Sequence, residues 1–195
     1  MSRGVSKKGG NGIIAIISLM IPLTPPLLIL VSNYEKGLKY VLNWLRENKP
    51  EKGLLSKVHN ATYQVLKDRF NLHPKLAQDY YRDAIAIYKS WLKNPKRGRY
   101  PRVRRVSVWL THNISYKLDL ENMKIWIRDV GELPILGYPR NLNFYKGWNI
   151  REARLVLRQG KVFLKVSLFK DYKEPLVKDG VDINMYEVVV GKDDS

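Results

Sequence analysis

The stretch "IIAIISLMIPLTPPLLILV" (residues 13–31) decides between two very different folds for this chain. Its length and apolar character, with basic residues upstream, resemble a membrane helix or a signal peptide. Pro25 and Pro26, however, would interrupt the hydrogen bonds of a spanning helix near its middle, and no small-residue cleavage site follows. We therefore favour a β-strand near residues 13–22, followed by a helix with Thr24 as its N-cap, and we expect no stable membrane association.

Apolar residues then recur at three- and four-residue spacing, which predicts three helices. Pro74 and the preceding "NLHP" separate the second helix from the third, and this short connection favours an antiparallel helical hairpin. Together the helices form a predicted unit over residues 26–94. The three predicted apolar stripes are Tyr34, Leu38, Val41, Leu42 and Leu45; Val58, Thr62, Val65, Leu66 and Phe70; and Leu76, Tyr80, Ala84, Ile87 and Trp91.

Beyond about residue 100 the apolar period changes to two. The runs are "VRRVSVWL", "ISYKLDL", "MKIWIRDV", "ARLVLRQ" and "KVFLKVSLF", with hairpin turns expected at "EN" (121–122) and "QG" (159–160). The predicted class is α+β. We expect segments 13–25 and 95–172 to form one antiparallel β-barrel with a basic outer face, interrupted by the helical unit 26–94.

The charge of the chain is unusual. Its 195 residues include 35 Lys and Arg against 18 Asp and Glu, a net charge of +17. Such self-repulsion favours a polyanionic partner, with nucleic acid first, an anionic membrane surface second and a merely basic protein third. The chain has no cysteine and only three histidines, which are far apart, so zinc sites built on cysteine are excluded.

The purest block of positive charge is "KNPKRGRYPRVRR" (residues 93–105), which contains no acidic residue and enough Pro and Gly to form a loop. We interpret it as a nucleic-acid-binding segment, with a solvated linker as the alternative. A second excess of basic residues lies between 140 and 170 and adds candidates from the predicted hairpin. The nucleic-acid-binding candidates are Lys93, Lys96, Arg97, Arg99, Tyr100, Arg102, Arg104, Arg105, Arg154, Arg158 and Lys161.

Three segments in order resemble the TnpB (OrfB) family, the transposon-encoded proteins related to type V CRISPR effectors. "HNATYQVLKDRFNLHPKLAQDYYRDAIAIYKSWLKN" (59–94) is similar to the family's helical pair, and "EARLVLRQGKVFLKVSL" (152–168) to its late β-hairpin. "GVDINMYEVVVG" (180–191) resembles the opening strand of its RuvC nuclease domain. The resemblance covers about residues 13–191.

The resemblance implies an RNA-guided DNA endonuclease with a wedge-like barrel, a helical recognition unit and a RuvC domain, which would begin at 173–195. Asp182 matches the first RuvC carboxylate. A RuvC centre needs three or four carboxylates around two Mg²⁺ ions, and the family's other carboxylates have no counterpart here. We therefore expect the amino-terminal portion of such a protein, without cleavage activity or a bound cofactor by itself, although complete members use Mg²⁺.

The expected partners are guide-type RNA and DNA, and the expected location is the cytoplasm, in association with the nucleoid. One alternative is half of a split nuclease, completed by a second chain that carries the rest of the RuvC domain and the metal ligands missing around Asp182. Another is an independent basic RNA- or DNA-binding protein. The last is a basic protein anchored in a membrane by residues 13–31.

Overall fold

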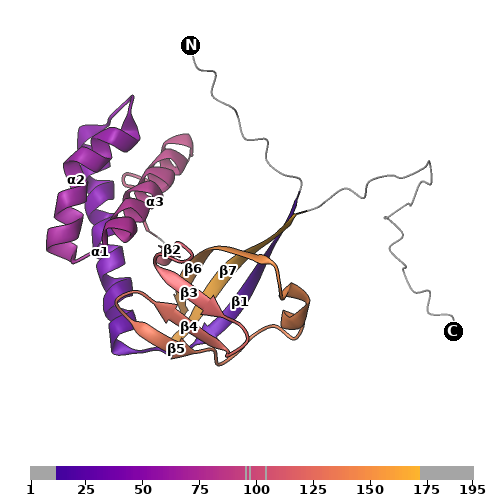
Figure 1. Ribbon diagram of the computed structural model, residues 1–195. Coiled ribbons are helices and arrows are strands. Elements are labelled where there is room, and N and C mark those ends of the chain that lie inside the picture. Colours follow the sequence, from indigo (N-terminus) through magenta and orange to yellow (C-terminus); the bar gives the residue numbers. More distant parts are fainter. Residues whose placement is uncertain (1–11, 95, 97, 104, 172–195) are drawn as a thin grey trace, which may run out of the picture. The chain divides into compact units, whose positions relative to one another are not determined.

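The apolar stretch 13–31 divides into a strand and a helix in the computed structural model of the chain, which describes residues 12–94, 96, 98–103 and 105–171 (Figure 1). Strand β1 (Gly12–Ile21) precedes helix α1 (Pro25–Asn48), with Thr24 at the N-cap and proline in the first turn, as predicted. The Thr24 side chain makes no capping hydrogen bond. Within the described residues, no helix has both the length and the apolar character needed to cross a bilayer.

The remaining elements confirm the α+β class, with three helices and antiparallel pairing among the strands. They are α2 (Leu54–Phe70), α3 (Pro74–Lys93), β2 (Ser107–Leu110), β3 (Tyr116–Asp119), β4 (Lys124–Ile127), β5 (Gly131–Pro134), the 3₁₀ helix η1 (Leu142–Tyr145), β6 (Asn149–Arg158) and β7 (Lys161–Asp171).

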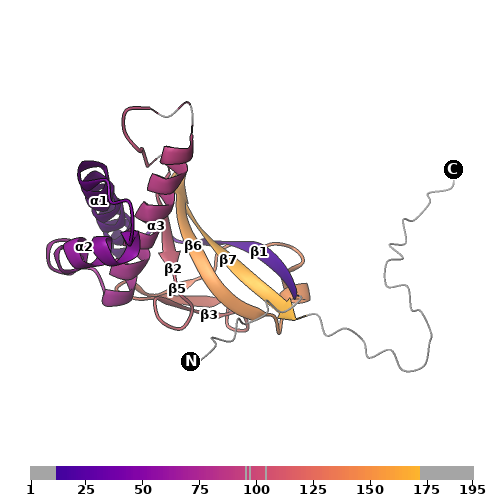
Figure 2. The ribbon, with the colours of Figure 1, turned by 90° about the horizontal axis from the view of Figure 1, so that it is seen from above.

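The three helices pack against one another through the predicted stripes (Figures 1 and 2). The whole α1 stripe is buried, whereas Ile87 and Trp91 at the end of α3 are only half-buried. Gly37 marks a close approach of the helices, because an added Cβ would lie 3.1 Å from both Leu66 Cδ2 and the Tyr80 ring. A glycine that costs helix propensity therefore permits tight packing there.

Four strands form one sheet in the order β1-β7-β6-β2, and three form a second in the order β3-β4-β5. The turn between β6 and β7 is the predicted "QG", and both Gln159 and Gly160 have positive φ, as the two central residues of a type I′ hairpin require. The helices lie in the sequence between β1 and β2, two strands of the same sheet. Strand β1 therefore joins the sheet of the late hairpin, as expected.

The predicted barrel is not closed. Strand β2 has only four residues, and α3 and α1 pack against it, so no described strand pairs with its outer side. The strands β3 to β5 pair among themselves. The segment that follows β5 meets β1 at Met20, whose N–H donates to the Gly137 carbonyl at 2.7 Å and whose carbonyl accepts from Leu136 N–H at 2.8 Å. The result is two open sheets.

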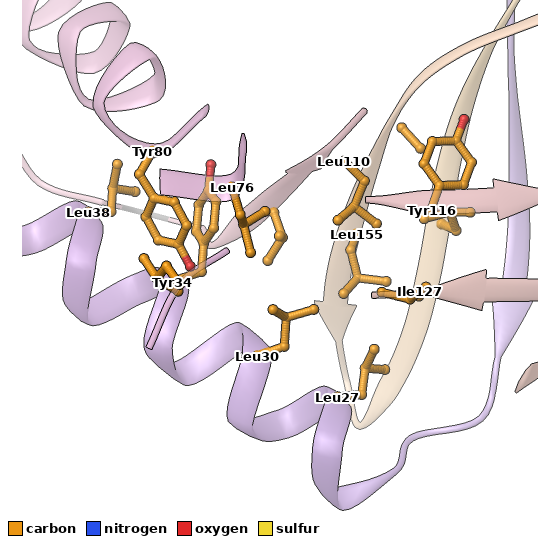
Figure 3. Packing of buried hydrophobic residues seen from close by; sticks show 14 of the residues in the cluster. Leu27, Leu30, Tyr34, Leu38, Leu76, Tyr80, Leu110, Tyr116, Ile127 and Leu155 are labelled. Atoms are coloured by element: carbon orange, nitrogen blue, oxygen red, sulfur yellow. The ribbon is translucent and has the colours of Figure 1, made fainter. Parts of the chain in front are cut away.

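One hydrophobic core joins the helices to both sheets. Figure 3 shows Leu27 and Leu30 of α1 extending toward Leu110, Leu155 and Ile127. Further along α1, Tyr34 and Leu38 pack against Leu76 and Tyr80 of α3. Residues 14–170 form one compact unit around this core.

Candidate nucleic-acid interface

The basic segment that follows α3 is held against the end of that helix. Trp91 Nε1–H on the last turn of α3 donates to the Gly98 carbonyl at 2.9 Å. The Lys96 N–H donates to Asn94 Oδ1, also at 2.9 Å. These bonds turn the chain back beside the helix, so that the basic side chains share a surface with α3.

A groove of about 690 Å³ lies between the end of α3 and this segment. One wall is helical and contains Ile87 and Trp91, while the other is the loop. The groove therefore combines an apolar and aromatic wall with cationic and peptide groups. Its lining residues are Ala86, Ile87, Ser90, Trp91, Asn94, Lys96, Gly98, Tyr100 and Arg102.

Two guanidinium groups lie close to the Tyr100 ring. The Arg46 guanidinium carbon is 4.7 Å from the ring centroid, and that of Arg99 is 5.4 Å away. Arg46 belongs to the last turn of α1, so this cation–π contact fixes the loop to a second helix. Tyr100 as a whole remains 41% exposed.

The predicted loop candidates in the described part of the chain are Lys93, Lys96, Arg99, Tyr100, Arg102 and Arg105, and all of them are exposed. Among the residues that the structure describes, no acidic side chain forms an ion pair with any of these cations. Their charges are therefore available to an external anion. Arg97, Arg104 and Asp182 lie outside the described residues.

The strand register brings part of the second basic group to the end of the sheet where the basic loop leads into β2. Ser107 pairs with Val156, so Arg105 and Arg158 each lie two residues beyond the last paired position of β2 and β6. Arg158 in turn pairs with Lys161 across the β6–β7 hairpin, and both side chains are exposed. The structure thus brings Arg158 and Lys161 near the end of the basic loop.

Arg154 differs from the other candidates because its charge is used inside the protein. Its guanidinium lies 4.4 Å above the centroid of the Trp109 ring and binds both carboxylate oxygens of Asp83, at 2.7 and 2.9 Å. The Tyr34 hydroxyl donates to the same carboxylate. Burial, and then the Asp83 charge, raise the pKa of Tyr34 well above its ordinary value, so the hydroxyl stays protonated as a donor.

A second aspartate, one turn earlier on α3, also links this helix to the end of β2. Asp79 is 2% exposed, accepts from Thr111 Oγ1 at 3.1 Å and lies 3.2 Å from Lys75 Nζ. Burial raises the pKa of Asp79, and Lys75 and Thr111 oppose that shift. We refer to Asp79, Asp83, Thr111 and Arg154 as the helix–sheet junction.

Sequence reasoning missed Asp79 and Asp83, although a usable signal was present. The two acids are four residues apart and flank the predicted apolar stripe of α3 at Leu76, Tyr80 and Ala84. Acids on a buried face require partners, so their spacing indicates contacts to another element.

Across the described part of the chain, no group of three or more His, Asp or Glu side chains is arranged to hold a metal ion. The chain matches no family model.

Proposed function

We propose that this chain binds nucleic acid through the groove at the end of α3 and the basic loop that forms its outer wall. The observation that supports this most directly is the set of exposed cations that lie beside the Trp91 and Tyr100 rings and form no ion pair with an acid in the described part of the chain. Lys and Arg bind phosphates, and aromatic rings offer stacking surfaces to bases. A groove with both features fits a nucleic-acid backbone better than a small metabolite.

The resemblance to TnpB-type proteins extends this proposal to a more specific role. The partners would be guide-type RNA and DNA, the open sheets would serve as the wedge-like part, and residues 173–195 would begin a RuvC-like domain. The chain would then act as the nucleic-acid-binding amino-terminal portion of an RNA-guided nuclease. The cation-lined groove supports the binding part of this role.

The test is the salt dependence of binding to a structured RNA and to a DNA duplex. In the loop variant, Lys96, Arg99, Arg102 and Arg105 are all replaced by Ala. Each lost phosphate contact makes the slope of log affinity against log salt shallower by about 0.7–0.9. If all four residues contact phosphate, we expect a slope shallower by about 3 and an affinity at low salt that falls by more than about 100-fold.

The matched control removes the same charge from another surface. Lys36, Lys52, Lys57 and Lys117 are exposed and lie outside the groove, so replacing them by Ala also lowers the net charge by four. A local interface predicts a much smaller change in slope for this control. Equal losses in both variants would mean that binding depends only on total charge, and binding that is indifferent to salt would reject the proposal.

A further inference from the structure

A second groove, of about 500 Å³, lies on the opposite edge of the four-stranded sheet from β2. It is formed by residues of β1, by one residue of β7, by the segment between β5 and η1 and by Tyr145 at the end of η1. Its lining residues are Ile16, Ile17, Ser18, Met20, Gly137, Tyr138, Pro139, Asn141, Tyr145 and Phe163. We call it the aromatic groove.

The rings of the aromatic groove are more accessible than a hydrophobic core would permit. Tyr138, which lines the groove, is 58% exposed. Phe144 lies beside the groove rather than in its lining: it contacts the lining residue Tyr145 edge-to-face, with 5.2 Å between centroids, and is 65% exposed. Trp148 packs against both Phe144 and Tyr145 and holds them in place. Phe144, Tyr145 and Trp148 thus pack on one another, while Tyr138 and Phe144 both stay exposed.

Hydrogen-bonding groups lie among these rings. Asn141 and Ser18 are exposed and line the groove, and the Asn141 side-chain N–H lies 3.5 Å from the Tyr145 hydroxyl. An amide and a hydroxyl beside aromatic surfaces match the needs of a nucleobase, which has both a flat face and a polar edge.

Cations border the groove. On β7, Lys161 and Lys165 flank Phe163 and point to the same outward face, because Val162 and Leu164 between them are buried. Arg140 is exposed within the segment that forms the other wall. None of the residues that line the groove is acidic. This charge distribution favours a polyanion with flat apolar groups over a neutral or basic protein surface.

We propose that the aromatic groove binds an unpaired base of single-stranded nucleic acid, with the flanking phosphates contacting Arg140, Lys161 and Lys165. A base offers its face for stacking only when it is outside a duplex, so the preferred ligand is a single strand or a loop. This inference rests on the proposed function and deepens it. The loop beside α3 binds the phosphate backbone, and the aromatic groove selects an unpaired segment.

The experiment uses the full chain and two probes of the same sequence. One is a single strand of about 12 nucleotides, within the usual range for single-strand sites, that carries 2-aminopurine, and the other is its duplex. For the double variant Tyr138→Ala and Phe144→Ala, we expect single-strand affinity to fall about 10- to 100-fold, with loss of the 2-aminopurine quenching. Duplex affinity should change by less than about twofold, because paired bases do not enter the groove.

Two further variants separate stacking from other effects. Tyr138→Phe combined with Phe144→Tyr keeps both rings and should retain single-strand binding. Leu136→Ala removes a neighbouring apolar side chain, 56% exposed, and should leave binding unchanged. An unchanged single-strand affinity in the double alanine variant would overturn the inference, and so would an equal loss in Leu136→Ala.

The loop variant distinguishes this inference from the proposed function. In one outcome, the loop variant leaves duplex affinity intact while the double alanine variant loses single-strand binding. That result would reject binding through the loop beside α3 and would support base binding in the aromatic groove. If sedimentation shows a dimer that the double alanine variant dissociates, with single-strand affinity unchanged, the groove is an interface between copies and the inference is overturned.

Discussion

Charged residues lie in the middle of helix α3 and in the basic loop at its end, and the two groups differ in whether they have partners within the protein. In the middle of the helix, Asp79 and Asp83 are buried and bound to Thr111, which follows β2, and to Arg154 of β6. At its end, the basic loop exposes its cations and, among the described residues, forms no ion pair with an acid. The first set holds the protein together, and the second is available to a partner. A basic residue therefore indicates a binding site only when the fold leaves its charge unpaired.

The largest effect that tests this contrast is expected from Asp83→Ala. The substitution leaves the Arg154 guanidinium without its carboxylate at a half-buried position. Loss of one partner of a buried pair costs about 3–5 kcal/mol, and the 35% exposure of the Arg154 side chain reduces this to about 2–3 kcal/mol of unfolding free energy. Urea denaturation measures the change.

The same variant belongs to a double-mutant cycle with Arg154→Ala. Because the two groups bind each other, we expect the double variant to lose less stability than the sum of the single variants. Additive losses would contradict the junction. If Arg154→Ala instead kept full stability and weakened nucleic-acid binding, Arg154 would belong to the interface, as the sequence alone suggested.

The next effect is expected from Tyr34→Phe. The variant keeps the ring that packs on Tyr80, at 3.9 Å between centroids, and removes only the hydroxyl that donates to Asp83. A hydrogen bond to a charged group contributes about 1.5–3 kcal/mol, so the unfolding free energy should fall by about 1.5 kcal/mol. Tyr40→Phe, which keeps its ring in the same way on another part of α1, is the control and should have little effect.

On the exposed side of the comparison, Tyr100→Ala should change binding and leave stability nearly intact. Tyr100 is 41% exposed, so we expect a loss of less than about 0.5 kcal/mol of unfolding free energy. If a base stacks on it, affinity for single-stranded nucleic acid should fall by roughly 5- to 10-fold, near the lower end for one stacking contact. Tyr100→Phe should restore binding, and a loss that it does not restore would show that the hydroxyl is what matters.

The smallest effect is a change in pH dependence at the junction. Since burial raises the pKa of Asp79 above its ordinary value of 3.8, the folded protein holds this proton more tightly than the unfolded chain. Its contribution is fully present below pH 3.8 and is lost as pH rises through the folded pKa. The stability of the protein relative to Asp79→Asn should therefore decline across that window. A relative stability that rises with pH would show that Lys75 and Thr111 outweigh burial.

Local patterns predicted the helices and many of the strands because they depend on neighbours in sequence. Pro25 and Pro26 excluded a continuous apolar helix, and the alternation in "KVFLKVSLF" correctly separated the buried Val162 and Leu164 from the exposed Lys161 and Lys165. The "QG" turn followed from the need for positive φ. Each of these features is set within a few residues.

The candidate site was predicted only in part. The acid-free composition of 93–105 identified the basic loop, but nothing in that segment indicated that Trp91 would bind Gly98 and form a groove. The sequence correctly placed β1 in the sheet of the late hairpin, but the predicted barrel does not close: β3 to β5 form a separate sheet, and α1 and α3 pack against β2, which are long-range contacts. Asp182 lies outside the described residues, and its role stays a prediction.

The sequence by itself determined the excess of positive charge, the three helices and the alternation of the strands, since composition and periodicity are local properties. Tertiary structure alone decided which charges are free. Arg154 and Arg158 both belong to β6 and look equivalent in the sequence, yet Arg154 reaches the buried Asp83 on α3 while Arg158 stays exposed at the hairpin. The difference arises because a buried carboxylate 71 residues away provides a partner for only one of them.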